Sequence, residues 1–355
     1  MRYALLLTLF CTLSVVAEPN AEALRARGPA VLDELKDVDD ATLDQICAQK
    51  DCRFSRLYWF TDLDAAKAEA HRKGKPILSL RLLGRLDEEV SCANSRFFRT
   101  ILYPDPSIAP LLREDFVLHW ESVRAVPTIT IELGDGRVIR QTITGNSAHY
   151  LLDANGRVLD VLPGMVSPAA YRAQLLAWRG LNESTDLRAY HGRALTQLIG
   201  TRSRFMAVPA VTASRAQPTA KNASRLAMTK SLIEAPVLTR LDPKASLREL
   251  PQAMWDSIGE GEKSKVVFSE PALELMARKQ PITEAMLDQL RASIAADTIL
   301  NQEELHYRIH EWFVYGNVSD FDSLNKRVYA ELFLTPLDDP WMGLKPATVF
   351  AALQE

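Results

Sequence analysis

Residues 58–83 read YWFTDLDAAKAEAHRKGKPILSLRLL, and they carry the strongest signal for the fold. Asp62 is a residue type that caps a helix N-terminus, and an alanine-rich run with helical spacing follows it. Gly74 suits the end of that helix, because glycine adopts left-handed backbone angles without steric cost. The apolar run Ile77–Leu83 then predicts a buried strand. The stretch therefore predicts a helix that leads directly into a central strand.

The following segment continues to alternate between helical and strand patterns. Gly134-Asp135-Gly136 and Ala154-Asn155-Gly156 are turn sequences, and each is flanked by strand-like runs. The predicted elements are a helix opening at Cys92, a strand at Phe116–Trp120, a hairpin at Thr128–Thr142, a hairpin at Tyr150–Leu162 and a helix at Ser167–Trp178.

Residues 58–181 resemble the thioredoxin-like superfamily, in particular its exported bacterial members. The matching residues at the start are Trp59, Asp62, Ala66, Gly74-Lys75-Pro76 and the Ile77–Leu83 strand. Phe116-Val117 matches the family's second central strand, and Leu151–Gly164 matches its last two strands. The resemblance implies a thioredoxin-like α/β domain, in which helices flank a central mixed sheet. We expect a smaller all-α domain to follow it.

The resemblance places Cys92 where this family keeps its attacking thiol. The family motif is Trp-Cys-x-x-Cys, and the matching residues here are Ser91-Cys92-Ala93-Asn94-Ser95. Ser95 therefore occupies the position of the second thiol. His149 lies near the thiol-facing loop of the resembled fold, which makes it the candidate neighbour of Cys92.

The family also places a cis-proline before its third strand, facing the thiol. Residues 145–149 precede the matching strand here and contain no proline. Pro127 is a candidate for that position if the hairpin at 128–143 is an insertion beyond it.

The chain has four cysteines. Cys11 lies in an apparent signal peptide, and Cys47 and Cys52 are close enough in sequence to bridge each other. A structural disulfide is favoured for that pair over a two-ligand metal site, because no further Cys or well-spaced His accompanies it. Cys92 is then the one cysteine of the mature chain outside this pair.

The first seventeen residues have the pattern of a secretory signal. Arg2 is followed by the apolar run Ala4–Val16, and small residues precede a cleavage site after Ala17. We expect an exported, periplasmic or extracellular protein, where disulfides persist. No later run is long and apolar enough for a transmembrane segment in the mature chain. The formal charge of −3 argues against nucleic acid as a general partner.

Composition divides the chain into five parts. The division is a signal peptide at 1–17, a helical segment at 18–54, the thioredoxin-like domain at 55–181, a linker at 182–233 and a helical domain at 234–355. The linker is rich in Ser, Thr and Ala, and residues 187–233 contain eight basic residues and no acidic one.

Two functions are consistent with a single thiol. A cysteine at a helix N-terminus gains thiolate character from the helix dipole. Cys92, with Ser95 beside it, would then form and reverse mixed disulfides with exported protein thiols, using a second thiol in trans. The alternative is an inert packing cysteine in a non-catalytic binding or adaptor module that holds a partner protein. No cofactor-binding motif is present in the sequence.

Glu303, His306 and His310 share one helical face, because offsets of three, four and seven residues coincide on a helix. Two imidazoles and a carboxylate are a metal-ligand set. One helix rarely completes a metal site, and Glu304 and Glu311 make this segment rich in charge. A solvated charged face is therefore the favoured interpretation.

Overall fold

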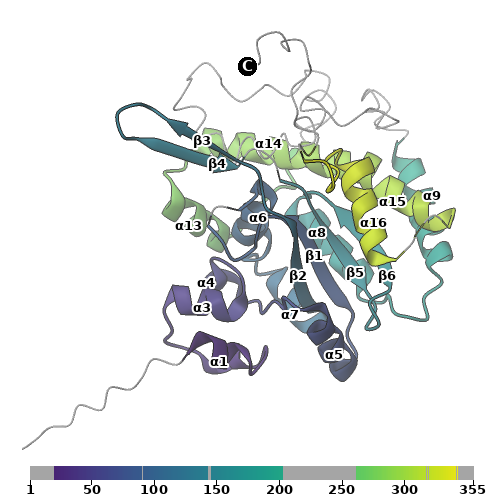
Figure 1. Cartoon of the computed structure of the whole chain (residues 1–355). Coiled ribbons are helices and arrows are strands. Elements are labelled where there is room, and N and C mark those ends of the chain that lie inside the picture. The colour runs from purple at the N-terminus through teal and green to yellow at the C-terminus, as the bar shows by residue number, and fades with distance from the viewer. Residues whose placement is uncertain are drawn as a thin grey trace, which may run out of the picture.

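A four-stranded mixed sheet lies at the centre of the fold, with helices against it and a helical C-terminal region (Figure 1). The computed structural model describes residues 20–89, 91–142, 145–202, 261–316, 318, 320–340 and 342. The predicted mixed α/β sheet followed by a helical region is therefore present. The predicted signal peptide at 1–17 and most of the predicted linker lie outside the described residues.

The sheet has the strand order β2-β1-β5-β6. Its strands are β1 (Ile77–Leu83), β2 (Val117–Arg124), β5 (Ser147–Leu152) and β6 (Val158–Pro163). β1 runs parallel to β2, with Ile77 opposite Val117, and antiparallel to β5, with Ile77 opposite Leu152. All seven residues of β1 are buried, since the strand is central and both of its faces are covered.

Successive side chains of each strand point to opposite faces of the sheet, so they pack into two hydrophobic cores, one on each face. The first contains Leu78, Leu80 and Leu82 together with Phe97, Trp178 and Ile294. The second contains Ile77, Tyr150 and Leu152 together with Ala66, Ile309 and Tyr329. The described part of the predicted helical domain at 234–355 thus contributes to both cores of the sheet, because its apolar helix faces are buried against the strands.

The helices that cover the sheet come from both halves of the chain. Those before residue 203 are α5 (Leu63–Lys73), α6 (Ala93–Phe97), the π-helical turn η1 (Phe98–Leu102), α7 (Ala109–Asp115), α8 (Pro168–Trp178) and α9 (Leu187–Arg202). Those after residue 260 are α13 (Glu270–Lys279), α14 (Glu284–Leu300), η2 (Asn301–Leu305), α15 (His306–Val314), α16 (Phe321–Arg327) and η3 (Val328–Leu332). α9 occupies the start of the predicted linker. Within the part of the chain described, no helix combines the length and the apolar character that crossing a membrane requires.

The N-terminal segment consists of short helices around its own small core. They are α1 (Ala21–Arg25), α2 (Val31–Glu34), α3 (Asp40–Cys47) and α4 (Cys52–Ser55). Cys47 and Cys52 lie at disulfide distance, with Cα atoms 6.3 Å apart, as the sequence predicted. Trp120 Nε1 in β2 donates to the Ala48 carbonyl (2.8 Å), which fixes this segment to the sheet.

A separate hairpin lies between β2 and β5 in sequence. Its strands β3 (Thr128–Glu132) and β4 (Val138–Thr142) pair with each other and form a two-stranded sheet of their own. Gly134 and Gly136 supply positive φ angles, 79° and 87°, at its turn. Figure 1 shows this hairpin projecting away from the central sheet.

Candidate functional site

Cys92 caps the N-terminus of α6, where the sequence predicted a helix to open. Its backbone is extended (φ −61°, ψ 157°), and its Sγ accepts from the Ser95 N–H at 3.4 Å. Gly84 directly follows β1, and a Cβ at that residue would lie 3.8 Å from the Cys92 nitrogen. The thiol therefore lies near the C-terminal end of the central strand β1.

The Cys92 side chain is completely buried. The backbone of Gly145, just before β5, packs directly against this side chain. A Cβ at position 145 would lie 2.3 Å from the Cys92 Cβ and 3.2 Å from the Ala93 nitrogen. Cys92 also shares a hydrophobic core with Ala148 and Tyr329. An attacking sulfur must reach the disulfide that it exchanges with, and this enclosure leaves Cys92 no exposed face for that approach.

Hydrogen bonds fix the segment that covers the thiol. Asn94 Nδ2 donates to Ser147 Oγ (2.8 Å), which ties α6 to the start of β5. Asn146 Nδ2 donates to Thr335 Oγ1 (2.8 Å), and the Tyr329 hydroxyl donates to the Asn146 carbonyl (2.9 Å). The C-terminal region therefore helps to hold residues 145–147 over Cys92.

The acidic residues before Cys92 are matched by basic groups. Asp87 pairs with Arg85 (2.7 Å), and Glu89 lies 3.5 Å from Lys279. Arg99 is fully buried and donates to the carbonyls of Glu88 (2.6 Å) and Glu89 (3.1 Å). Burial lowers the pKa of Arg99, while Asp51 and Glu89 oppose that shift. This loop is thus held from inside by the Arg99 guanidinium.

Ser95 is buried, and its hydroxyl donates to the Arg85 carbonyl at 3.4 Å. The structure therefore brings Ser95 next to Cys92 through the Ser95 backbone N–H, while the Ser95 hydroxyl bonds elsewhere. Pro127 lies at the base of the hairpin, and no peptide bond among the described residues is cis.

His149 is buried away from Cys92. Its neighbours Phe98, Tyr103 and Tyr171 belong to the core of the opposite sheet face, and its Nε2 forms a hydrogen bond with the Tyr103 hydroxyl (2.9 Å). Burial lowers the pKa of His149 to about 3, so its imidazole is neutral at pH 7. The structure does not place His149 beside the thiol. Side chains alternate along β5, so its neighbours Ala148 and Tyr150 point into the core that contains Cys92, while His149 points to the opposite face of the sheet.

The histidines of α15 do not lie on a solvated face, and that interpretation is wrong. His306 and His310 are 6% and 3% exposed, while Glu303 lies in η2, the turn before α15. Burial arises because α15 packs between strand β6 and helix α9. Figure 1 shows α9 and α15 beside each other at the β6 edge of the sheet.

Asp160 of β6 and His191 of α9 complete this cluster. The fully buried Asp160 carboxylate accepts from His306 Nε2 (3.2 Å), and His191 Nδ1 lies 2.7 Å from His310 Nδ1. Burial by itself raises the pKa of Asp160, but the His306 imidazole and the other two histidines outweigh it and hold that pKa below its usual range. The sequence analysis missed Asp160 and His191. The available signal was an aspartate inside the apolar run Val158–Leu162.

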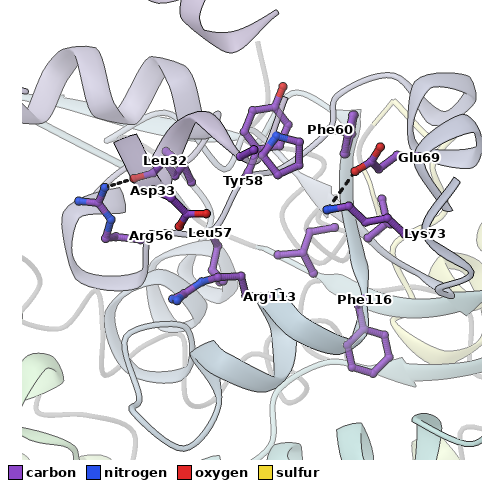
Figure 2. Close-up of a pocket in the computed structure, with 14 residues that line it drawn as sticks. Leu32, Asp33, Arg56, Leu57, Tyr58, Phe60, Glu69, Lys73, Arg113 and Phe116 are labelled. Atoms are coloured by element: carbon purple, nitrogen blue, oxygen red, sulfur yellow. Dashed lines mark hydrogen bonds and ion pairs between the residues drawn. The ribbon is translucent and has the colours of Figure 1, made fainter. Parts of the chain in front are cut away.

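A pocket of about 190 Å³ lies elsewhere, between the N-terminal helices and the α5–β2 side of the sheet (Figure 2). Four of the charged side chains that line it bond within the protein. Lys73 pairs with Glu69 (3.1 Å), Arg56 donates to the Leu35 carbonyl (2.7 Å), and Arg113 donates to the Ser55 carbonyl (3.2 Å). None of the residues that line this pocket belongs to the Cys92 enclosure or to the histidine cluster.

Comparison with known proteins adds no relative. No protein-family model matches the chain, and no curated protein matches it. The Cys92 enclosure, the projecting hairpin and the buried cluster of Asp160 with three histidines are the structural features that bear on function.

Proposed function

We propose that this chain is an exported, non-catalytic binding module with a thioredoxin-like scaffold, and that its β3–β4 hairpin holds an extended segment of a partner protein. The observation that carries the proposal is the position of this hairpin. The hairpin lies between β2 and β5 in sequence, and its two strands project from the central sheet. After β4, the chain reaches Gly145, which packs against Cys92.

The covered thiol favours binding over disulfide exchange. Exchange proceeds through a mixed disulfide, so the sulfur of Cys92 must contact a sulfur of the partner. The enclosure by Gly145 and by the core opposes that contact. A monothiol function would require residues 145–147 to leave their hydrogen bonds to Asn94, Thr335 and Tyr329.

The hairpin offers backbone groups for strand addition. The Leu133 N–H donates to the Arg137 carbonyl (3.0 Å), so these two residues form a hydrogen-bonded pair. Hydrogen-bonded and open pairs alternate in antiparallel sheets, which makes Thr130 and Arg140 an open pair. Their N–H and C=O groups point away from the hairpin, where an added strand would bond to them.

Exposed apolar side chains accompany these edges. Leu133 and Val138, at the ends of the two strands, are 39% and 58% exposed. An added strand that covers them would gain apolar burial as well as backbone hydrogen bonds. Glu132 and Asp135 balance Arg137 and Arg140 in this segment, so we expect a partner segment without strong net charge.

The binding arm of the test uses the edge of β3. Thr130→Pro removes an N–H that points outward, so the hairpin should persist while strand addition fails. Thr130→Val is the matched control, because it keeps the N–H. A photo-crosslinking residue placed at position 138, in cells that express the protein, should form a covalent adduct with the partner. The adduct should still form in the Thr130→Val variant and should be absent in the Thr130→Pro variant. The same residue at exposed Arg172 should not yield it. An adduct that survives Thr130→Pro, or none at all, would count against the proposal.

The thiol arm of the test uses iodoacetamide on the native protein, followed by peptide mapping. Cys92 should label slowly in the folded protein and fully in denaturant. Labelling of folded protein at the rate of the denatured chain would favour the monothiol function instead.

A further inference from the structure

We propose that Asp160, His191, His306 and His310 form a structural site for a divalent first-row transition metal, with Zn²⁺ as the first choice. The ligand atoms of Asp160, His191 and His310 all lie within 4.8 Å of one another. They come from β6, α9 and α15, three elements that are far apart in the sequence. A metal here would fasten both helices to the edge strand of the sheet.

The distances between the donor atoms are close to those of a metal site. Zn²⁺ binds imidazole nitrogen and carboxylate oxygen at about 2.0–2.2 Å, which separates neighbouring ligand atoms of a tetrahedron by about 3.4 Å. His306 Nε2 lies 3.2 Å from Asp160 Oδ1, close to that separation. His191 Nδ1 and His310 Nδ1 are 2.7 Å apart, so they need to part by less than about 1 Å to coordinate one ion. His306 lies outside the group of three ligand atoms that come within 4.8 Å of one another. Its ring centroid is 4.2 Å from that of His310, and its Nε2 contacts the Asp160 carboxylate, so we infer that it moves in as the fourth ligand when the ion binds.

Backbone and side-chain partners orient the donors. His191 Nε2 bonds to the Leu159 carbonyl (3.0 Å), so it carries the proton and leaves the Nδ1 lone pair directed at His310. Asp160 Oδ2 accepts from Trp178 Nε1 (2.8 Å) and from the Tyr190 hydroxyl (3.1 Å), which turns Oδ1 toward His306. Metal-binding histidines and carboxylates have outer partners of this kind.

The donor side chains are buried, and the donor set is three imidazoles and one carboxylate. Asp160 and His191 are fully buried, and His310 is nearly so. Three imidazoles and one carboxylate suit Zn²⁺, Cu²⁺ or Ni²⁺ far better than Ca²⁺ or Mg²⁺, which prefer oxygen ligands.

The site is of the structural kind. Four protein ligands fill a tetrahedral coordination shell and leave no position for substrate or water. The expected effect of the metal is therefore on stability, since an ion that binds the folded chain alone shifts the unfolding equilibrium. This inference is independent of the hairpin and of Cys92.

The test uses the full chain, stripped with a chelator and then titrated with Zn²⁺ alone. We expect one Zn²⁺ per chain and a rise in melting temperature. Co²⁺ in place of Zn²⁺ should give the visible absorption of a four-coordinate nitrogen and oxygen site. His191→Asn and His310→Asn should each weaken Zn²⁺ binding by about 100-fold or more. His119→Asn is the matched control: this histidine is also buried and bonded, to Ser79 Oγ (2.8 Å), but it should leave Zn²⁺ binding unchanged.

Several results would overturn the proposal. One is a folded wild-type chain that takes up no Zn²⁺ and shows no thermal shift, which would make the cluster a metal-free hydrogen-bond network. Another is Zn²⁺ binding that His191→Asn and His310→Asn leave intact, which would place the ion elsewhere. If both variants fail to fold by circular dichroism, the Co²⁺ spectrum of the wild type and the milder His306→Gln variant decide. Octahedral Co²⁺, or unchanged affinity in His306→Gln, would contradict the four-ligand site.

Discussion

Gly145 lies so close to Cys92 that a methyl group at position 145 would overlap the cysteine side chain, at 2.3 Å between the two Cβ positions. These residues are far apart in the sequence, yet each restricts the other. Glycine is needed at 145 because the backbone passes directly over the sulfur-bearing residue, and Cys92 is covered for the same reason.

Gly145→Ala should destabilise the protein by about 1–3 kcal/mol, because the added methyl group overpacks a well-filled site and displaces residues 145–147. Urea unfolding followed by circular dichroism measures the change. Gly180→Ala is the control, since nothing lies within 4 Å of a Cβ there, and it should be close to neutral. Equal stability of the two variants would show that the covering segment shifts freely.

Ser95→Cys should not produce a working dithiol site. Ser95 is as buried as Cys92, so a thiol introduced there remains enclosed. Turnover of insulin disulfides by the folded variant should equal that of the wild type, and mass spectrometry after denaturing alkylation should confirm that the new thiol is present. Turnover clearly above the wild-type level would mean that the enclosure opens to substrates.

Tyr329→Phe should loosen the cover over Cys92. The buried hydroxyl donates to the Asn146 carbonyl (2.9 Å) and approaches the Arg81 carbonyl (3.3 Å), so its removal leaves buried acceptors unsatisfied and costs about 1–3 kcal/mol. Native labelling of Cys92 by iodoacetamide should also become faster. Tyr315→Phe, at a residue that is 68% exposed, should change neither property. A stable Tyr329→Phe protein with unchanged labelling would contradict this role.

His119 should make stability depend on acid pH. Burial and, to a smaller extent, Arg81 lower its pKa from 6.5 to about 3 in the folded chain. The unfolded chain therefore takes up a proton first as the pH falls, and the free energy of unfolding decreases from pH 6.5 toward pH 3. His119→Asn should reduce the slope between about pH 4 and 6 by about 1.4 kcal/mol per pH unit. Denaturant titrations at several pH values measure it, and an unchanged slope would show that His119 is protonated in the folded state.

Local patterns explain which parts of the fold were predictable. The cap at Asp62, the end of the helix at Gly74 and the apolar run Ile77–Leu83 act within a few residues, and α5 and β1 form where they indicate. The glycines at 134 and 136 likewise give the β3–β4 turn. Such signals depend on backbone preferences and periodicity, which a short window of sequence contains.

The site was less predictable because it depends on distant segments. Nothing near Cys92 in the sequence indicates that Gly145 will cover it. The helical spacing of His306 and His310 shows that they share a face but not what that face contacts. That contact depends on Asp160, a charged residue in the buried strand β6, which required partners from elsewhere in the chain. An aspartate within an apolar strand is therefore the signal that deserved a search for complementary histidines.

The sharing of both hydrophobic cores with the C-terminal helices has a consequence for biosynthesis. Ribosomes deliver the strands of the sheet first, and the buried residues between Val266 and Met342 that complete its two faces follow later. A nascent chain that has emerged only to residue 202 exposes apolar strand surface on both sides. We therefore expect the sheet to fold only after residues up to 342 have emerged, and to need protection from aggregation until then.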